Sequence, residues 1–181
     1  MIVLMAGLPG TGKTALAREL ARRTSGRILS KDEFRHAVFL PGEIEYSTRQ
    51  DDMVLQLVLE TARYLLDRDR SRILFLDGRP FSRRYQIDNV IRFANSAEQS
   101  WRILECACSE ENARRRLTSD TTHPAENRGY QLYLDVKARF EEILYPKVVL
   151  DTDQPFETCV KRGLAALSSK EAGPNEPIVA R

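Results

Sequence analysis

The sequence predicts an α/β domain built on a five-stranded parallel sheet, and three observations point to this fold class. Short β-rich runs alternate with longer helical stretches, and two of these runs are apolar almost throughout. The 181 residues are enough for one domain with a substantial core. Because strands that alternate with helices favour a parallel sheet covered on both faces, we expect a three-layer α/β/α arrangement.

The expected strands are short and are separated by helical stretches or turns. The first and third are nearly continuous apolar runs, as expected for parallel strands that are buried on both faces. The five expected strands span 2–6, 27–30, 72–76, 101–107 and 147–150.

Seven helices are expected between and after these strands. Two of them begin with an S/T-x-x-E/Q capping box, at 30–33 and 47–50, which satisfies free N–H groups of the first turn. Asp153 is expected to cap the last helix. The expected helices span 13–24, 31–40, 47–69, 82–98, 109–119, 130–144 and 154–167.

Length and composition indicate one domain at 1–169, with a lid at about 114–130 and a flexible tail at 170–181. With 42% hydrophobic and 30% charged residues, the chain is neither collagen-like nor wholly disordered. No apolar run approaches the ~20 residues that cross a bilayer. The opening residues 1–7 are too short, and lack the basic flank, for a secretory signal. We therefore expect a cytoplasmic protein without membrane contacts.

The charge and the cysteines exclude two further classes. A net charge of +2 gives no reason to expect a general polyanion-binding surface. The 22 arginines outnumber the 6 lysines, which fits either phosphate recognition by guanidinium groups or a codon-usage bias. Cys106, Cys108 and Cys159, with only His36 and His123 beside them, have no zinc-ligand spacing, so reduced thiols are expected.

The strongest local signal is the pattern G-x-x-x-x-G-K-[ST] between the first strand and the first helix. Its glycines let backbone N–H groups wrap around a phosphate at a helix N-terminus. Lys13 is expected to reach the β- and γ-phosphates of ATP, and the Thr14 hydroxyl to bind Mg²⁺. The predicted phosphate-binding loop comprises Gly7, Leu8, Pro9, Gly10, Thr11, Gly12, Lys13 and Thr14.

A second acidic position follows the third strand. Asp77 ends the apolar run 73–76 and resembles a Walker B carboxylate, which contributes to Mg²⁺ binding in phosphate-loop proteins. Ligands of doubly wound sheets lie beyond the carboxyl ends of the strands, where Asp77 is expected. A turn or helix-cap aspartate is the alternative interpretation.

The second strand leads into Ser30-Lys31-Asp32-Glu33-Phe34-Arg35. The phosphate-binding loop followed by strand-S-x-D-x-x-R resembles small P-loop kinases such as polynucleotide 5′-kinases, zeta toxins and chloramphenicol phosphotransferase, which carry an AAA-type ATP-binding domain. The resemblance covers residues 1–165 in layout, with high specificity only over the first 35. It implies the P-loop NTPase fold, with strand order 2-3-1-4-5.

The same resemblance implies that Asp32 accepts the proton of the substrate hydroxyl and that Arg35 contacts the substrate or its phosphate. Independently, the two residues are three apart and therefore share one face of a helix. The alternative for Asp32 is an acid that simply stabilises the first helical turn through the helix dipole.

The resemblance also implies an arginine-bearing helix that runs into a lid over the triphosphate. Arg116, just before Leu117, matches the family position, with Arg114 near it on the edge of the core. Relatives often have another arginine about four residues later, where this chain has Asp120. Arg128 is expected to replace it, and a solvated charged face is the alternative for the whole group.

Beyond Asp77, a basic and aromatic group is open to two interpretations. It could bind an anionic substrate at the mouth of the sheet, or it could be a solvated loop and helix start. The group comprises Arg79, Phe81, Arg83, Arg84 and Tyr85.

Together these features predict a kinase that transfers the γ-phosphate of Mg·ATP to a hydroxyl of a small molecule, such as a sugar, nucleotide-sugar, nucleoside or antibiotic. A nucleic-acid 5′ end is a less favoured acceptor, because no basic groove with interleaved aromatic residues stands out. An ATPase or nucleotide switch, with water as the acceptor, is the other alternative.

Overall fold

Five parallel strands form one sheet in the order β2-β3-β1-β4-β5, which confirms the expected topology. The structure is a computed structural model that describes residues 1–119 and 129–169. Residues 120–128 of the expected lid at about 114–130, and the expected tail at 170–181, lie outside the described residues. The strands are β1 (Ile2–Ala6), β2 (Arg27–Ser30), β3 (Leu74–Asp77), β4 (Trp101–Ala107) and β5 (Val148–Asp151).

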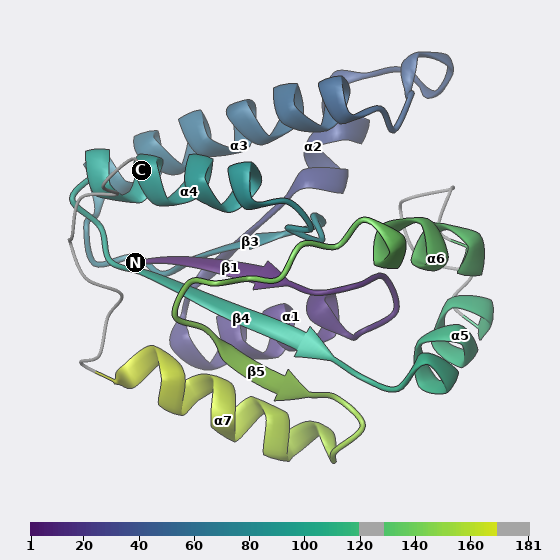
Figure 1. The fold of residues 1–181 in the computed structure, drawn as a ribbon. Helices are drawn as coiled ribbons and strands as arrows, with labels where there is room; N and C mark the ends of the chain where they lie inside the picture. The colour runs from purple at the N-terminus through teal and green to yellow at the C-terminus, as the bar shows by residue number, and fades with distance from the viewer. Residues whose placement is uncertain (120–128, 170–181) are drawn as a thin grey trace.

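Helices cover both faces of this sheet, so the three-layer arrangement is confirmed (Figure 1). One face packs against α3 and α4, the other against α1 and α7. Helices α5 and α6 lie beyond the carboxyl ends of the strands (Figure 1). Among the described helices, none is long and apolar enough to cross a membrane. The helices are α1 (Lys13–Thr24), α2 (Lys31–Val38), α3 (Thr48–Arg68), α4 (Arg84–Ser96), α5 (Glu110–Ser119), α6 (Tyr130–Ala138) and α7 (Phe156–Ser168), with a short 3₁₀ helix, η1 (Pro41–Glu43).

Strand β1 lies at the centre of the sheet, and all five of its residues are completely buried. Successive side chains of a strand point to opposite faces. Ile2, Leu4 and Ala6 therefore pack toward α3 and α4, while Val3 and Met5 pack toward α1 and α7. This two-sided burial explains why the β1 sequence is apolar without interruption.

The helix starts agree with the capping signals in two cases and differ in the third. The Ser30 and Ser47 hydroxyls accept hydrogen bonds from the first turns of α2 and α3. The prediction that Asp153 caps the last helix was wrong. Its carboxylate accepts hydrogen bonds from Ser109 N and Asn112 Nδ2, both at 2.7 Å. Asp153 thus stabilises the start of α5, and α7 begins after Pro155.

Helix α6 ends at Ala138, and the prediction that it continues to 144 was wrong. The chain leaves the helix because it is held against the sheet layer. Glu141 N donates a hydrogen bond to Ser82 O at 2.9 Å, and Ile143 packs into the core beneath α4, with 4% of its surface exposed. Leu144, the next residue, is 73% exposed. Local helical pattern is overridden here by tertiary contacts.

This extended segment gives a matched pair of variants. Ile143→Ala removes a buried side chain and should lower the free energy of unfolding by about 2–4 kcal/mol. Leu144→Ala, one residue later, should change it by less than about 0.5 kcal/mol. Urea unfolding of both variants checks this, and equal losses would contradict the placement of Ile143 in the core.

Candidate functional site

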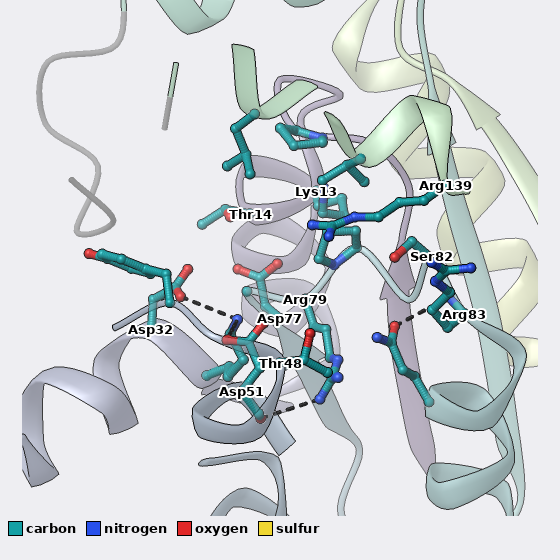
Figure 2. Close-up of a pocket in the computed structure, with 18 of the residues that line it drawn as sticks. Lys13, Thr14, Asp32, Thr48, Asp51, Asp77, Arg79, Ser82, Arg83 and Arg139 are labelled. Atoms are coloured by element: carbon teal, nitrogen blue, oxygen red, sulfur yellow. Dashed lines mark hydrogen bonds and ion pairs between the residues drawn. The ribbon is translucent and has the colours of Figure 1, made fainter. Parts of the chain in front are cut away.

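A cavity of about 520 Å³ lies at the carboxyl ends of β1, β2 and β3. The loops after these strands form part of its wall, and the starts of α3 and α4 and the end of α6 complete it (Figure 2). A volume of this size is typical of small-molecule sites. The charged side chains that line it are Lys13, Lys31, Asp32, Asp51, Asp77, Arg79, Arg83, Arg139 and Glu141.

The phosphate-binding loop places Lys13 in this wall, between β1 and α1. Lys13 Nζ donates hydrogen bonds to Gly7 O and Leu8 O, at 2.8 and 2.7 Å. Gly12 precedes α1 in the left-handed region, with φ 83°, and supplies no side-chain cap. The first turn of α1 also lacks an acidic residue. The N-terminus of α1 therefore offers backbone N–H groups and a positive dipole end to an anion.

Thr14, in the first turn of α1, and Asp77, at the end of β3, line the same cavity. Asp77 is 4% exposed, and its buried Oδ1 has no hydrogen-bond partner. A buried carboxylate oxygen without a donor fits a cation ligand, so these residues fit the expected Mg²⁺. The described residues contain no group of three or more His, Cys, Asp or Glu side chains that could hold a metal. Mg²⁺ bound here would depend on Thr14, Asp77 and phosphate oxygens, which is a usual environment for this ion.

Asp32 lies in the first turn of α2, close to the end of β3. Ser30, the last residue of β2, pairs with Asp77 in the parallel ladder, so the segments that follow β2 and β3 leave the sheet at the same edge. Asp32 is 7% exposed and lines the cavity. Gly78, in the left-handed region with φ +85°, passes so close that an added Cβ would lie 3.1 Å from Asp32 N and Oδ2. The Asp32 carboxylate is thus held at the cavity wall by close packing.

Arg35 lies behind Asp32 and is 1% exposed, so it does not line the cavity. Its Nη1 donates to Asp32 Oδ1 at 3.2 Å, and its Nη2 donates to the Asp51 carboxylate. The guanidinium also lies over the Tyr46 ring, 4.8 Å from the ring centre. The structure therefore brings Arg35 to the predicted acid, on the side away from the cavity.

Asp51, in the first turn of α3, is a residue that sequence reasoning missed. It accepts hydrogen bonds from Lys31 Nζ, at 2.7 Å, and from Arg35. Burial lowers the pKa of Lys31, and the Asp51 carboxylate opposes this effect. Asp51 is 16 residues from Arg35 and 20 from Lys31, so no local spacing pattern could have identified it.

The basic and aromatic residues after Asp77 lie in different environments. Arg79 is 2% exposed and donates to Asp52 Oδ1 and Asp51 O, so it is not a solvated loop residue. Phe81 belongs to the core. Arg83 and Tyr85 line the cavity, whereas Arg84 is 4.0 Å from Asp88 outside it.

Two of the expected lid arginines, Arg114 and Arg116, do not line this cavity. Arg116 donates to Thr152 Oγ1 and Thr152 O, at 2.9 and 2.7 Å. The Thr152 hydroxyl donates in turn to Thr11 O, at 3.0 Å, so Arg116 joins the phosphate-binding loop to the loop after β5. Arg114 lies over the Tyr130 ring, at 5.0 Å, and connects α5 to α6. Arg128 lies outside the described residues.

The three cysteines are free thiols. Cys106 and Cys159 are buried and Cys108 is half-buried. Burial raises the pKa of Cys106 to about 12, and it also raises the pKa values of Cys108 and Cys159. Neutral thiols of this kind are poor nucleophiles, so the chemistry of the cavity depends on its carboxylates and cations.

Several solved structures are similar to this chain. A sugar kinase from Janibacter sp. HTCC2649 is 20% identical, with a TM-score of 0.62, over 92% of this chain and 93% of that chain. A gluconokinase from Sinorhizobium meliloti 1021 is 18% identical, with a TM-score of 0.67, over 92% and 90%. The Mycobacterium tuberculosis APS kinase CysC, in complex with AMPPNP and APS, is 17% identical, with a TM-score of 0.70, over 93% and 97%. At these identities the likeness shows the fold.

A search of curated protein sequences finds no match. A family model described as an AAA domain matches residues 2–143, which is more than half of the chain. The parallel sheet order, the phosphate-binding loop and the neighbouring kinase structures agree with this match. The chain therefore belongs to this AAA-domain family, and its fold is that of a small P-loop kinase.

Proposed function

We propose that the protein is a phosphotransferase that moves the γ-phosphate of Mg·ATP to a hydroxyl of a small molecule. One observation carries this proposal: the phosphate-binding loop, the Thr14–Asp77 pair and the Asp32 carboxylate all line one cavity (Figure 2). The kinase names of the neighbouring structures support it. The cavity volume of about 520 Å³ favours a sugar, nucleoside or similar acceptor over a polymer end.

In this reaction the acceptor oxygen attacks the γ-phosphorus and forms a new P–O bond. The bond from the γ-phosphorus to the oxygen that bridges it to the β-phosphate breaks, and ADP leaves. Asp32 takes the proton of the acceptor hydroxyl, and Lys13 balances charge on the β- and γ-phosphates. Mg²⁺, held by Thr14 and Asp77, would supply further charge neutralisation on the phosphate oxygens.

The arginines have supporting roles in this proposal. Arg35 holds the Asp32 carboxylate from behind, and Asp51 holds Arg35 and Lys31, so Arg35 and Asp51 are positioning residues. Arg116 fixes the phosphate-binding loop against Thr152. Phosphate contacts from Arg114 and Arg128 stay predictions.

The acceptor can be identified by an ADP-release screen with sugars, nucleosides, nucleotide-sugars, antibiotics and 5′-hydroxyl oligonucleotides. A small-molecule kinase should release ADP in proportion to one class of added alcohol. ADP release that no added alcohol changes would indicate an ATPase. Release that depends on oligonucleotides and falls steeply with salt would indicate a nucleic-acid kinase.

Lys13→Ala should lower phosphoryl transfer by roughly 10²-fold or more, because it removes a cation from the developing phosphate charge. The fold should remain intact, because Lys13 is half-buried and does not belong to the hydrophobic core. Lys161→Ala, on the exposed face of α7, is the matched control. ADP release and thermal stabilisation by Mg·ATP are the measurements, and equal values for both variants would exclude the phosphate-binding loop from the mechanism.

Asp32→Asn should lower kcat by roughly 10²–10⁴-fold while the Kd for Mg·ATP stays near that of the wild type, because asparagine cannot take up the proton. Glu33→Gln is the control, since Glu33 lies in the same first turn of α2 and is exposed. It removes a charge from the same end of the helix dipole. Near-normal turnover of Asp32→Asn would transfer the role of base to another group.

Asp51→Asn should lower the free energy of unfolding by about 1–3 kcal/mol, because Lys31 and Arg35 lose a charged hydrogen-bond acceptor. The pKa of Lys31 should also fall further, because burial lowers it and the Asp51 carboxylate opposes that effect. Asp67→Asn, on the exposed side of the same helix, should change neither quantity. Urea unfolding and NMR titration of the Lys31 amino group are the measurements, and an unchanged stability together with an unchanged Lys31 pKa would contradict this role of Asp51.

A further inference from the structure

Arg139 is a cation in the cavity wall that the mechanism above does not use. It follows the last residue of α6, and Figure 2 shows its side chain extending from the ribbon into the cavity. The side chain is exposed, and it makes no hydrogen bond or ion pair with any residue that the structure describes. This cation therefore faces the cavity without a counter-charge from the described chain.

The other cations on the acceptor side of the cavity are already balanced. Each of them has a carboxylate partner close enough for a hydrogen bond: Lys31 with Asp51 at 2.7 Å, Arg79 with Asp52 at 2.5 Å, and Arg83 with Glu141 at 2.9 Å. Of the two remaining carboxylates in the cavity wall, Asp32 pairs with Arg35, and Asp77 is the proposed Mg²⁺ ligand. Within the described residues, Arg139 is thus the charge in excess on this side of the cavity.

The fold keeps Arg139 in this place. Arg139 N donates to Val136 O and closes the last turn of α6, and Phe140 packs against the core. One residue later, Glu141 N donates to Ser82 O, and the Glu141 carboxylate accepts hydrogen bonds from Arg83 Nη1 and Arg84 N. Arg139 is therefore anchored on both sides by its chain neighbours, and Glu141 ties this segment to Ser82 and Arg83.

These contacts join the segment that carries Arg139 to the loop between β3 and α4. This loop contributes Ser82 and Arg83 to the cavity wall, whereas the phosphate-binding loop follows β1 and contributes Lys13 as its own cation. A guanidinium has five donors in a planar fork that matches a carboxylate or a phosphate in two parallel hydrogen bonds. The Ser82 side chain also lines the cavity and is a further polar group there.

We propose that the acceptor carries an anionic group, a carboxylate or a phosphate, in addition to its reactive hydroxyl, and that Arg139 binds this group. The inference rests on the proposed phosphotransferase function and narrows its substrate class. Neutral sugars, nucleosides and uncharged antibiotics are then poor acceptors. Arg139 acts as a specificity-determining residue that contacts substrate, and Arg83 assists from the same wall.

The test uses acceptors in pairs that differ by one anionic group: glycerol and glycerol 3-phosphate, sorbitol and gluconate, glucose and glucose 6-phosphate, adenosine and AMP. ADP release is measured for the full chain with Mg·ATP, for Arg139→Gln and Arg139→Lys. Arg162→Gln, on the exposed face of α7, is the matched control. Carboxylate and phosphate pairs in the same panel show which anion the site prefers.

We expect the anionic member of at least one pair to have a kcat/KM roughly 10- to 100-fold above its neutral partner. Arg139→Gln should remove this preference, mainly through KM, and Arg139→Lys should retain part of it because lysine keeps the charge without the fork. The Kd for Mg·ATP should stay unchanged in both variants. Equal use of both members of the productive pairs, or an Arg139→Gln variant that weakens Mg·ATP and keeps the preference, would overturn the proposal.

Binding without turnover separates this inference from the proposed function. With a non-hydrolysable ATP analogue present, isothermal titration measures gluconate, glycerol 3-phosphate and AMP against the wild type and Arg139→Gln. Anion binding that depends on Arg139, without phosphorylation of any alcohol, would support the anion site and reject the kinase reaction. Phosphorylation of neutral alcohols alone, with no anion bound, would support the kinase and reject the anion site.

Discussion

Burial of β1 and β3 on both faces is the constraint on which the site depends. All residues of these two strands are buried, so their chains can meet solvent and ligands only where the strands end. Because both strands are parallel and in register with β2, the phosphate-binding loop, Asp77 and Asp32 leave the sheet at one edge. The core thereby determines where chemistry can occur, before any functional side chain is considered.

The site also requires cations that balance its carboxylates. Several carboxylates lie close together at that edge of the sheet, where they are partly shielded from water. Uncompensated carboxylates this close would favour protonation, which would remove a base and a cation ligand. The network of Arg35, Lys31 and Asp51 balances Asp32 from behind, within the protein. The buried Oδ1 of Asp77 has no hydrogen-bond partner, so this oxygen is suited to bind a cation such as Mg²⁺. The two carboxylates thus differ in their surroundings as their proposed roles require.

The sequence was most informative where the signal is local. The phosphate-binding loop and the strand-end position of Asp77 follow from apolar runs, glycine spacing and a neighbouring helix, and the structure agrees with them. The strand order was implied by the resemblance to small P-loop kinases, and the structure confirms it. The end of α6 and the partner of Asp153 could not be predicted, because contacts with Ser82 and Ser109, far along the chain, decide them. Asp51 could not be predicted for the same reason, because its partners Lys31 and Arg35 are 20 and 16 residues away along the chain. The burial of Arg35 could not be predicted either. Its spacing from Asp32 indicates that the two residues share one face of the helix, but it does not indicate which part of the protein covers that face.

The cavity therefore has two halves of different origin. The half that is proposed to bind phosphate comes from one contiguous loop and two strand ends. Substitutions there should affect phosphoryl transfer to any acceptor. The acceptor half is assembled from the starts of α3 and α4 and the end of α6, and the core does not depend on the exposed tips of those side chains. Substitutions at such positions can change which molecule binds while the sheet edge, and the base on it, stay in place. In the proposed reaction, acceptor specificity thus depends on the helix ends around the sheet, and phosphoryl transfer depends on the edge of the sheet itself.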